Sequence, residues 1–241
     1  MDKENAEMNA VLEKAESVLT LLPGFQYLYN GKADDSVLEY LLKRGWAIEA
    51  RDEETVLRAE KAGMDRYDIY YTAPCKDRAI IEANIGKCRF VASDFKEMEL
   101  INEAAAKILA PGYLEVVGLS VIPEKYDDGK QSGFPIEELP QLSAAARKLR
   151  SISIRGCFVQ GHTNGLYGES LGRYLRDCYE TAKQVTTIIP CGMSYVNACN
   201  CMEPLFRTLQ SGGKTQEELM TAAGILAKQN QTAFYAKLLV Q

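Results

Sequence analysis

The stretch FQYLYNGKADDSVLEYLLKRG, residues 25–45, contains one complete strand–turn–helix unit. Phe25–Asn30 is aromatic and apolar, which predicts a short β-strand, and the asparagine and glycine that close it predict a turn. The apolar-periodic run from Ser36 to Arg44 predicts a helix, which Gly45 ends. Lys32 follows the turn at the carboxyl end of the predicted strand. In α/β folds the functional groups lie at this end.

The same alternation of short strands and longer helices continues along the chain. We predict strands at 25–30, 46–50, 67–72, 89–92, 113–122, 152–159 and 186–189, and either a strand or a helical tail at 234–240. Helices are predicted at 5–20, 36–44, 52–62, 77–84, 94–109, 136–149, 166–184, 200–209 and 215–228. Seven or eight such units in 241 residues match the size of a closed (β/α)8 barrel. We therefore expect one α/β domain over residues 1–241, a TIM-like barrel that is irregular toward its C-terminal end.

An open, doubly wound sheet is the alternative fold. Its nucleotide-binding versions carry GxGxxG or Walker sequences, and neither occurs here.

Composition narrows the range of partners. The chain is 46% hydrophobic and 25% charged, and its formal net charge is −5. This negative charge does not suggest binding to nucleic acid, or to a membrane through a polybasic segment. No apolar run approaches the roughly 20 residues that span a bilayer. The polar, acidic beginning of the chain does not resemble a secretory signal, so a cytoplasmic location is expected.

The seven cysteines are irregularly spaced, and Cys199 and Cys201 form a CxC rather than a CxxC pair. The chain has a single histidine, His162. Reduced thiols and no metal site are therefore expected.

Several segments resemble a known family in order and spacing. Tyr29 and Lys32 have the spacing of a Tyr-x-x-Lys-Ala-Asn stretch, and DIYYTAPCK (68–76) is similar to a strand followed by Asn-Pro-Cys-Lys. IRGCFVQGHTNG (154–165) resembles a Gly-x-x-x-His-x-Gly-Ser strand, and TTIIPCG (186–192) a Leu-Asp-Ile-Gly-Gly-Gly strand. Together they resemble the barrel of the fold-type III pyridoxal-phosphate decarboxylases, which act on ornithine, arginine and diaminopimelate and share the alanine racemase-like fold.

The resemblance implies a lyase or racemase of amino acid metabolism with pyridoxal phosphate as cofactor. Lys32 would be the Schiff-base lysine, and His162 would be a second catalytic residue at the pyridine face. The substrate would be an amino acid or amine, most simply a basic amino acid changed at its α-carbon by decarboxylation or racemisation. The residues expected to bind the cofactor are Lys32, Tyr29, Gln160, Gly161, His162, Gly192 and Ser194.

The chain also departs from the family pattern. Ser120 stands where the family has an arginine, Gln160 aligns with the stacking histidine, and the acidic residue of strand two aligns near Ile48 or Glu49. No Glu-Pro-Gly-Arg turn is recognisable, and the family's C-terminal β-domain, which completes the site across a dimer, is not found. Lys32 as a solvated turn residue, and the chain as a non-catalytic binding or regulatory barrel or a cofactor carrier, therefore remain alternatives. A homodimer is an expectation from the resemblance only.

Overall fold

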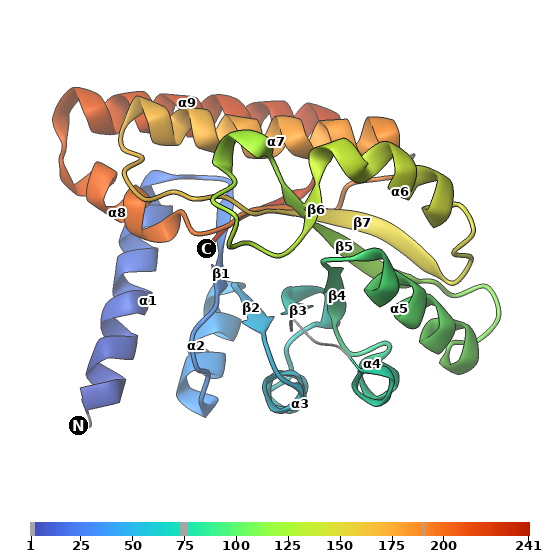
Figure 1. Ribbon diagram of the computed structural model, residues 1–241. Coiled ribbons are helices and arrows are strands. Elements are labelled where there is room, and N and C mark those ends of the chain that lie inside the picture. Colours follow the sequence, from blue (N-terminus) through green and yellow to red (C-terminus); the bar gives the residue numbers. More distant parts are fainter. Residues whose placement is uncertain (1–2, 73–76, 190) are drawn as a thin grey trace.

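The computed structural model describes residues 3–72, 77–189 and 191–241 and contains a closed barrel of eight parallel strands (Figure 1). Around the barrel the order is β1–β2–β3–β4–β5–β7–β8–β9, and β9 pairs with β1 to close it. The predicted TIM-like fold is confirmed. The strands are β1 (Phe25–Tyr29), β2 (Ala47–Ala50), β3 (Ile69–Tyr71), β4 (Arg89–Ala92), β5 (Glu115–Ile122), β7 (Ile152–Val159), β8 (Tyr195–Ala198) and β9 (Lys237–Val240), and β6 (Phe134–Pro135) pairs with the end of β5.

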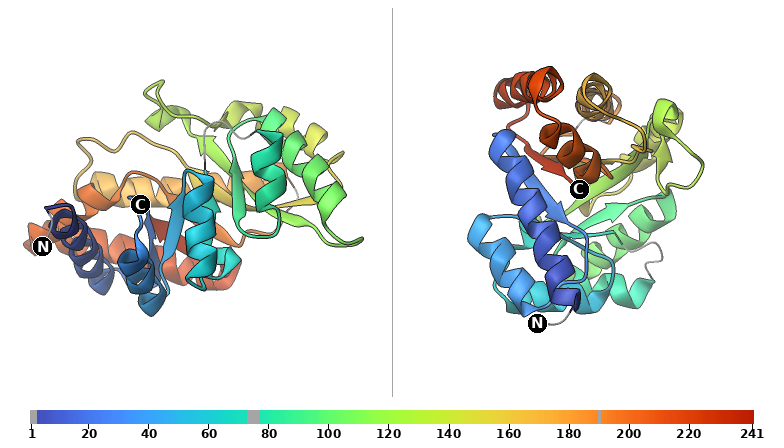
Figure 2. Two further views of the ribbon diagram at one scale, coloured as in Figure 1. Left: turned by 90° about the horizontal axis from the view of Figure 1, so that it is seen from below. Right: turned by 90° about the vertical axis from the view of Figure 1, so that its left-hand side faces the viewer.

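Helices surround the barrel. The α-helices of the described ranges are α1 (Lys3–Leu21), α2 (Asp35–Arg44), α3 (Glu53–Lys61), α4 (Arg78–Asn84), α5 (Phe95–Ile108), α6 (Leu139–Ala146), α7 (Glu169–Ile188), α8 (Met202–Gln210) and α9 (Gly213–Ala233). Short 3-10 turns lie at Arg66–Asp68, Glu124–Tyr126 and Ile136–Glu138. The long helices α7 and α9 pack side by side, and α1 packs against α8 (Figures 1 and 2). The irregularity expected near the C-terminal end is the pair of helices, rather than one, between β8 and β9.

The prediction of a strand at 186–189 is wrong. Residues 186–188 are the last turn of α7, and the strand is β8, which begins at Tyr195. Thr186 and Thr187 are β-branched, but the hydroxyl of each donates to the Lys183 carbonyl within the helix. Their strand propensity therefore gives way to a helix whose buried face packs on the barrel.

The interior of the barrel is filled by side chains from its strands. One buried cluster combines Leu28, Ala47, Tyr70, Val91, Phe158, Tyr195, Cys199 and Leu239, and β5 contributes no side chain to it. The Tyr195 ring lies against β5 and β7 at Gly118 and Gly156, where any Cβ atom would overlap the ring. Tyr195 also packs edge-on against Tyr70, with 4.7 Å between ring centroids. These side chains therefore fill the middle of the barrel.

Among the described residues, no helix combines the length and the apolar character needed to cross a bilayer.

Candidate functional site at the carboxyl end of the barrel

Polar side chains line two adjoining hollows where the barrel strands end. The first hollow has a volume of about 260 Å³ and lies beside Lys32; it is lined by Asn30, Gly31, Lys32, Ala33, Glu49, Arg51, Asp52, Glu54, Thr55 and Arg58. The second, also about 260 Å³, lies over the barrel axis and is lined by Glu49, Arg51, Thr72, Val91, Ser93, Ser120, Ser132 and Gln160. Glu49 and Arg51 belong to both, so this ion pair divides the mouth of the barrel.

Glu49 connects distant strands at the mouth. Its carboxylate accepts hydrogen bonds from Thr72 and from the Gln241 side chain, and it pairs with Arg51 at 3.1 Å. Glu49 is buried and faces the mouth, whereas Ile48 packs into the outer core, so Glu49 is the inward-facing acid of β2. The sequence contained a signal for this: Glu49 lies two residues after the inward-facing Ala47, on the same side of the strand.

Lys32 lies three residues beyond the end of β1, on the rim. The Tyr29 hydroxyl donates to the Lys32 backbone carbonyl at 2.9 Å, and this contact shapes the turn. Burial, and then the charge of Asp34, raise the pKa of the Tyr29 hydroxyl, which therefore stays protonated as a donor. The Lys32 side chain is exposed, and no hydrogen bond or ion pair of its amine is found within the described ranges. The amine is thus available at the edge of the first hollow.

Two arginines lie around the same hollow. Arg51 holds Glu49, and Arg58 donates to the Ala33 carbonyl at 3.2 Å while pairing with Glu54 at 3.4 Å. Sequence reasoning did not select Arg58. The signal for it was weak, because Arg58 lies in the last turn of α3 and reaches the hollow only through the packing of α3 beside β2.

The candidate residues that follow β7 lie in different surroundings. Gln160 lines the second hollow. His162 lines neither hollow; its Nδ1 lies 3.1 Å from a carboxylate oxygen of Asp128, and its backbone N–H donates to the Tyr126 carbonyl. Gly161 is buried, and a Cβ there would lie 2.7 Å from the Tyr174 ring. The structure therefore does not bring His162 together with Lys32.

Gly192 and Ser194 lie at the opposite, amino end of the barrel. Because α7 continues to Ile188, both residues precede β8 instead of following a strand. The Ser194 N–H donates to the Arg155 carbonyl at 2.6 Å, near the beginning of β7. Their predicted position beside Lys32 is wrong.

The residues that do follow β8 are Cys199, Asn200 and Cys201. Asn200 has a left-handed backbone, with φ of 58°, a conformation that favours glycine. Both cysteines are buried, and the backbone N–H groups of Cys201 and Met202 donate to the Gln241 carbonyl at 2.7 and 2.8 Å. These amides are already occupied within the protein.

The turn at 73–76, singled out with DIYYTAPCK, lies outside the described residues. Within the described ranges, no group of three or more histidine, cysteine or acidic side chains is placed to hold a metal ion.

The sequence matches no protein-family model and no curated protein. Solved structures do match. Diaminopimelate decarboxylase from Helicobacter pylori, complexed with L-lysine, aligns with a TM-score of 0.68 at 14% identity, over 97% of this chain and 61% of that chain. The arginine decarboxylase of Paramecium bursaria Chlorella virus aligns with a TM-score of 0.65 at 12% identity, over 97% and 61%. An SrLDC mutant in complex with PLP aligns with a TM-score of 0.64 at 18% identity, over 97% and 59%.

The chain has the barrel fold of these decarboxylases. The resemblance to the barrel domain of the fold-type III enzymes is thereby confirmed at the level of fold. The chain spans about three fifths of the length of each of these relatives.

The rim residues fit pyridoxal phosphate at two points. Lys32 offers an available amine for the aldehyde, and Arg51 and Arg58 offer positive charge for the phosphate across the same hollow. The β7–β8 side does not supply the cradle that the resemblance implies, since His162 turns to Asp128 and the amides after β8 are occupied. The residues that fit pyridoxal phosphate therefore lie beside β1 and β2, and not beside β7 and β8.

Proposed function

We propose that this chain is a pyridoxal-phosphate-binding barrel in which Lys32 is the Schiff-base lysine. The observation that carries the proposal is the available Lys32 amine on the rim of a hollow that also contains Arg51 and Arg58. Condensation with an aldehyde needs a lysine amine in its neutral form and within reach of the bound carbonyl. The two guanidinium groups supply positive charge for an anionic phosphate.

The proposed activity is decarboxylation or racemisation of a basic amino acid. When bound, pyridoxal phosphate supplies an electron sink for charge at an amino-acid α-carbon. Around it, the chain's own acidic groups Glu49, Asp52 and Glu54 line the hollow and would attract the distal ammonium of a basic substrate. Gln160, the neighbouring polar group over the barrel axis, would orient the substrate by hydrogen bonds.

The first experiment tests cofactor attachment. Pyridoxal phosphate is added to the protein, reduced with borohydride, and the modified peptide is identified by mass spectrometry, with the absorbance spectrum recorded before reduction. We expect modification at Lys32 and loss of the absorbance band in Lys32→Ala. Lys43→Ala is the matched control, because Lys43 is an exposed lysine of α2 paired with Glu39. Equal labelling of both lysines, or a band that persists in Lys32→Ala, contradicts the proposal.

The second experiment tests turnover. Lysine, ornithine, arginine and diaminopimelate are incubated with the cofactor-loaded protein, and released carbon dioxide and changes of optical rotation are measured. Activity that disappears in Lys32→Ala supports the catalytic assignment.

A binding barrel without turnover is the second candidate function. It is favoured by the Glu49–Arg51 pair and the Gln241 side chain, which occupy the mouth, and by the occupied amides after β8. Lys32-dependent cofactor attachment without activity on any of the four amino acids would favour a carrier. A partner found by native mass spectrometry, with no cofactor attachment, would favour a regulatory role. The same measurement reports whether the chain forms a homodimer.

A further inference from the structure

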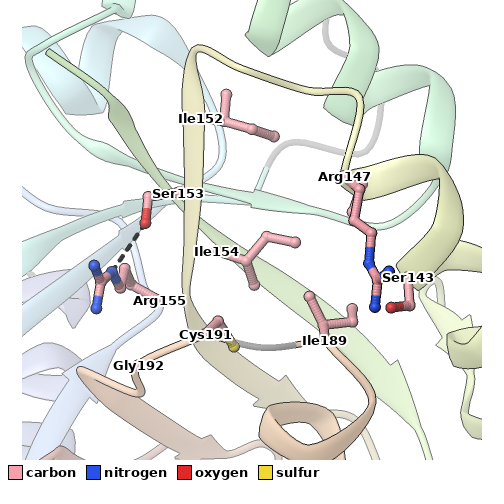
Figure 3. Close-up of a pocket in the computed structure, with 10 residues that line it drawn as sticks. Ser143, Arg147, Ile152, Ser153, Ile154, Arg155, Ile189, Cys191 and Gly192 are labelled. Atoms are coloured by element: carbon pink, nitrogen blue, oxygen red, sulfur yellow. Dashed lines mark hydrogen bonds between the residues drawn. The ribbon is translucent and has the colours of Figure 1, made fainter. Parts of the chain in front are cut away.

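A larger cavity than either of the two hollows at the carboxyl end lies at the amino end of the barrel, away from Lys32. Its volume is about 580 Å³, within the range of small-molecule sites, and it lies between α6, the first half of β7 and the connection from α7 to β8 (Figure 3). It is lined by Ser143, Ala146, Arg147, Ile152, Ser153, Ile154, Arg155, Ile189, Cys191 and Gly192.

The cavity exists because β7 begins before its neighbour. β5 pairs with β7 from Ile152 onward, whereas β8 pairs with β7 only from Gly156. The segment Ile152–Ile154 therefore has a strand on one side and an open edge on the other, up to Arg155, whose carbonyl accepts from the Ser194 N–H. The α7–β8 connection, with Cys191 and Gly192, borders this edge without filling it.

The walls combine an apolar floor with positive charge. Ile152, Ile154 and Ile189 are buried and form the floor, and Figure 3 shows them on the α6 side of β7. Arg147 lies at the α6 border of the cavity. Arg155 projects with Ser153 from the other face of β7, its Nε donating to the Ser153 hydroxyl at 2.9 Å, and its guanidinium lies at the edge of β7 beside Gly192. No acidic residue is part of this lining.

The surrounding sequence strengthens the positive charge. Residues 147–155 contain four cationic side chains (Arg147, Lys148, Arg150 and Arg155) and no acidic one, although the chain as a whole carries a net charge of −5. A cationic ligand would be repelled from this surface, and an anion would be attracted to it.

We propose that this cavity binds a small amphipathic carboxylate, with its apolar body on the isoleucine floor and its carboxylate at Arg147 or Arg155. Guanidinium groups bind carboxylates through two parallel hydrogen bonds, and an apolar body gains free energy by covering Ile152, Ile154 and Ile189. The site is separate from the Lys32 hollow and does not depend on the proposed cofactor.

Cys191 provides a reporter for occupancy. Its thiol is half-buried in the lining, whereas the other cysteines of the described ranges are buried. Burial raises the pKa of the Cys191 thiol, and the nearby Arg155 charge opposes that effect. A ligand seated on the floor would cover this thiol and slow its alkylation.

The experiment measures the iodoacetamide labelling rate of Cys191 by peptide mass spectrometry with and without octanoate, below its micelle concentration. If the bound form is protected, the rate falls about tenfold at ten times the dissociation constant. Acetate has the charge without the apolar body, and octanol has the body without the charge, so both should protect far less.

Variants identify the anion contact. Arg147→Gln combined with Arg155→Gln should abolish protection by octanoate, each rate being compared with that of the same variant without ligand. Arg150→Gln is the matched control, because Arg150 belongs to the same cationic segment but does not line the cavity. Circular dichroism melting confirms that the variants are folded. Unchanged labelling with octanoate, equal protection by octanol, or protection retained in the double variant would each overturn the proposal.

Discussion

Two buried tyrosines show how much a single hydroxyl group matters in this barrel. The Tyr174 hydroxyl donates to the Cys199 carbonyl at 2.8 Å and also lies 3.3 Å from the Val159 carbonyl, so it joins α7 to the ends of two strands. The Tyr195 hydroxyl is equally buried, but within the described ranges it has no hydrogen-bond partner. The Tyr195 ring fills the barrel between two glycines, so Tyr195 stabilises the fold by the packing of its ring and not by its hydroxyl group.

Removing the two hydroxyl groups should therefore have different effects. Tyr174→Phe should lower the free energy of unfolding by about 1 kcal/mol, because the Cys199 carbonyl loses the hydroxyl that donates to it. Tyr195→Phe should leave that free energy unchanged or raise it, since a buried unpaired hydroxyl costs free energy in the folded state. Urea unfolding of both variants is the measurement. A loss in Tyr195→Phe as large as that in Tyr174→Phe would show that the Tyr195 hydroxyl is paired after all.

At the scale of the elements, aspartate side chains start the helices that follow the first four strands. Asp34, Asp52, Asp77 and Asp94 each accept a backbone N–H in the first turn of α2, α3, α4 and α5. Ser36 and Ser93 lie within two residues of the caps Asp34 and Asp94 but do not themselves cap a helix. The Ser36 hydroxyl donates to the capping carboxylate of Asp34. The Ser93 hydroxyl donates to Glu97, in the first turn of α5.

The Asp34 cap lies next to the Lys32 turn and should depend on pH. Hydrogen bonds from the Ser36 hydroxyl and the Val37 N–H lower the Asp34 pKa below its ordinary value of 3.8. A lowered carboxyl pKa stabilises the folded state above the unfolded pKa, and this contribution is lost as the pH falls through the folded value. Asp34→Ala should therefore cost about 1 kcal/mol at pH 7 and progressively less below about pH 3.8.

The measurement is the difference in urea midpoint between the wild type and Asp34→Ala at several pH values, which cancels the titration of other groups. Asp35→Ala is the control, since Asp35 lies in the first turn without capping the helix. A midpoint difference that stays constant down to pH 3 would contradict the capping role.

At the scale of the whole molecule, closure of the barrel places Glu49 of β2 beside the end of β9. The Gln241 side chain donates to Glu49 and also accepts from Asn197 of β8, at 3.4 Å. With Thr72 after β3, four strand ends thus meet around one buried carboxylate. This network both joins the ends of the barrel and limits the space at its mouth.

Removing this carboxylate should loosen the whole mouth. Glu49→Ala should lower the free energy of unfolding by about 1–3 kcal/mol, because the Thr72 hydroxyl and the buried Gln241 amide lose their acceptor and Arg51 loses its ion-pair partner. Glu49→Gln should cost less, since its amide oxygen still accepts. Hydrogen exchange should speed up at the ends of β3 and β9, and the exposed Glu203→Ala provides a control with little effect. Equal stability of Glu49→Ala and Glu203→Ala would argue against the network.

The alternation of strands and helices is predictable from the sequence, because helical and strand periodicities are local. Six of the eight barrel strands lie where that pattern predicts a strand, and β9 lies in the segment predicted to be either a strand or a helical tail. The sequence also placed Lys32, Arg51 and Gln160 at strand ends, where a parallel barrel gathers its polar groups. That the β-branched residues 186–188 finish a helix depends on tertiary packing, because burial of the α7 face outweighs their strand propensity. Because α7 continues to Ile188, Gly192 and Ser194 lie before β8, at the opposite end of the barrel from Lys32. Likewise, the turn of His162 toward Asp128 and the meeting of Glu49 with Gln241 depend on contacts between residues far apart in the chain, which no local pattern contains.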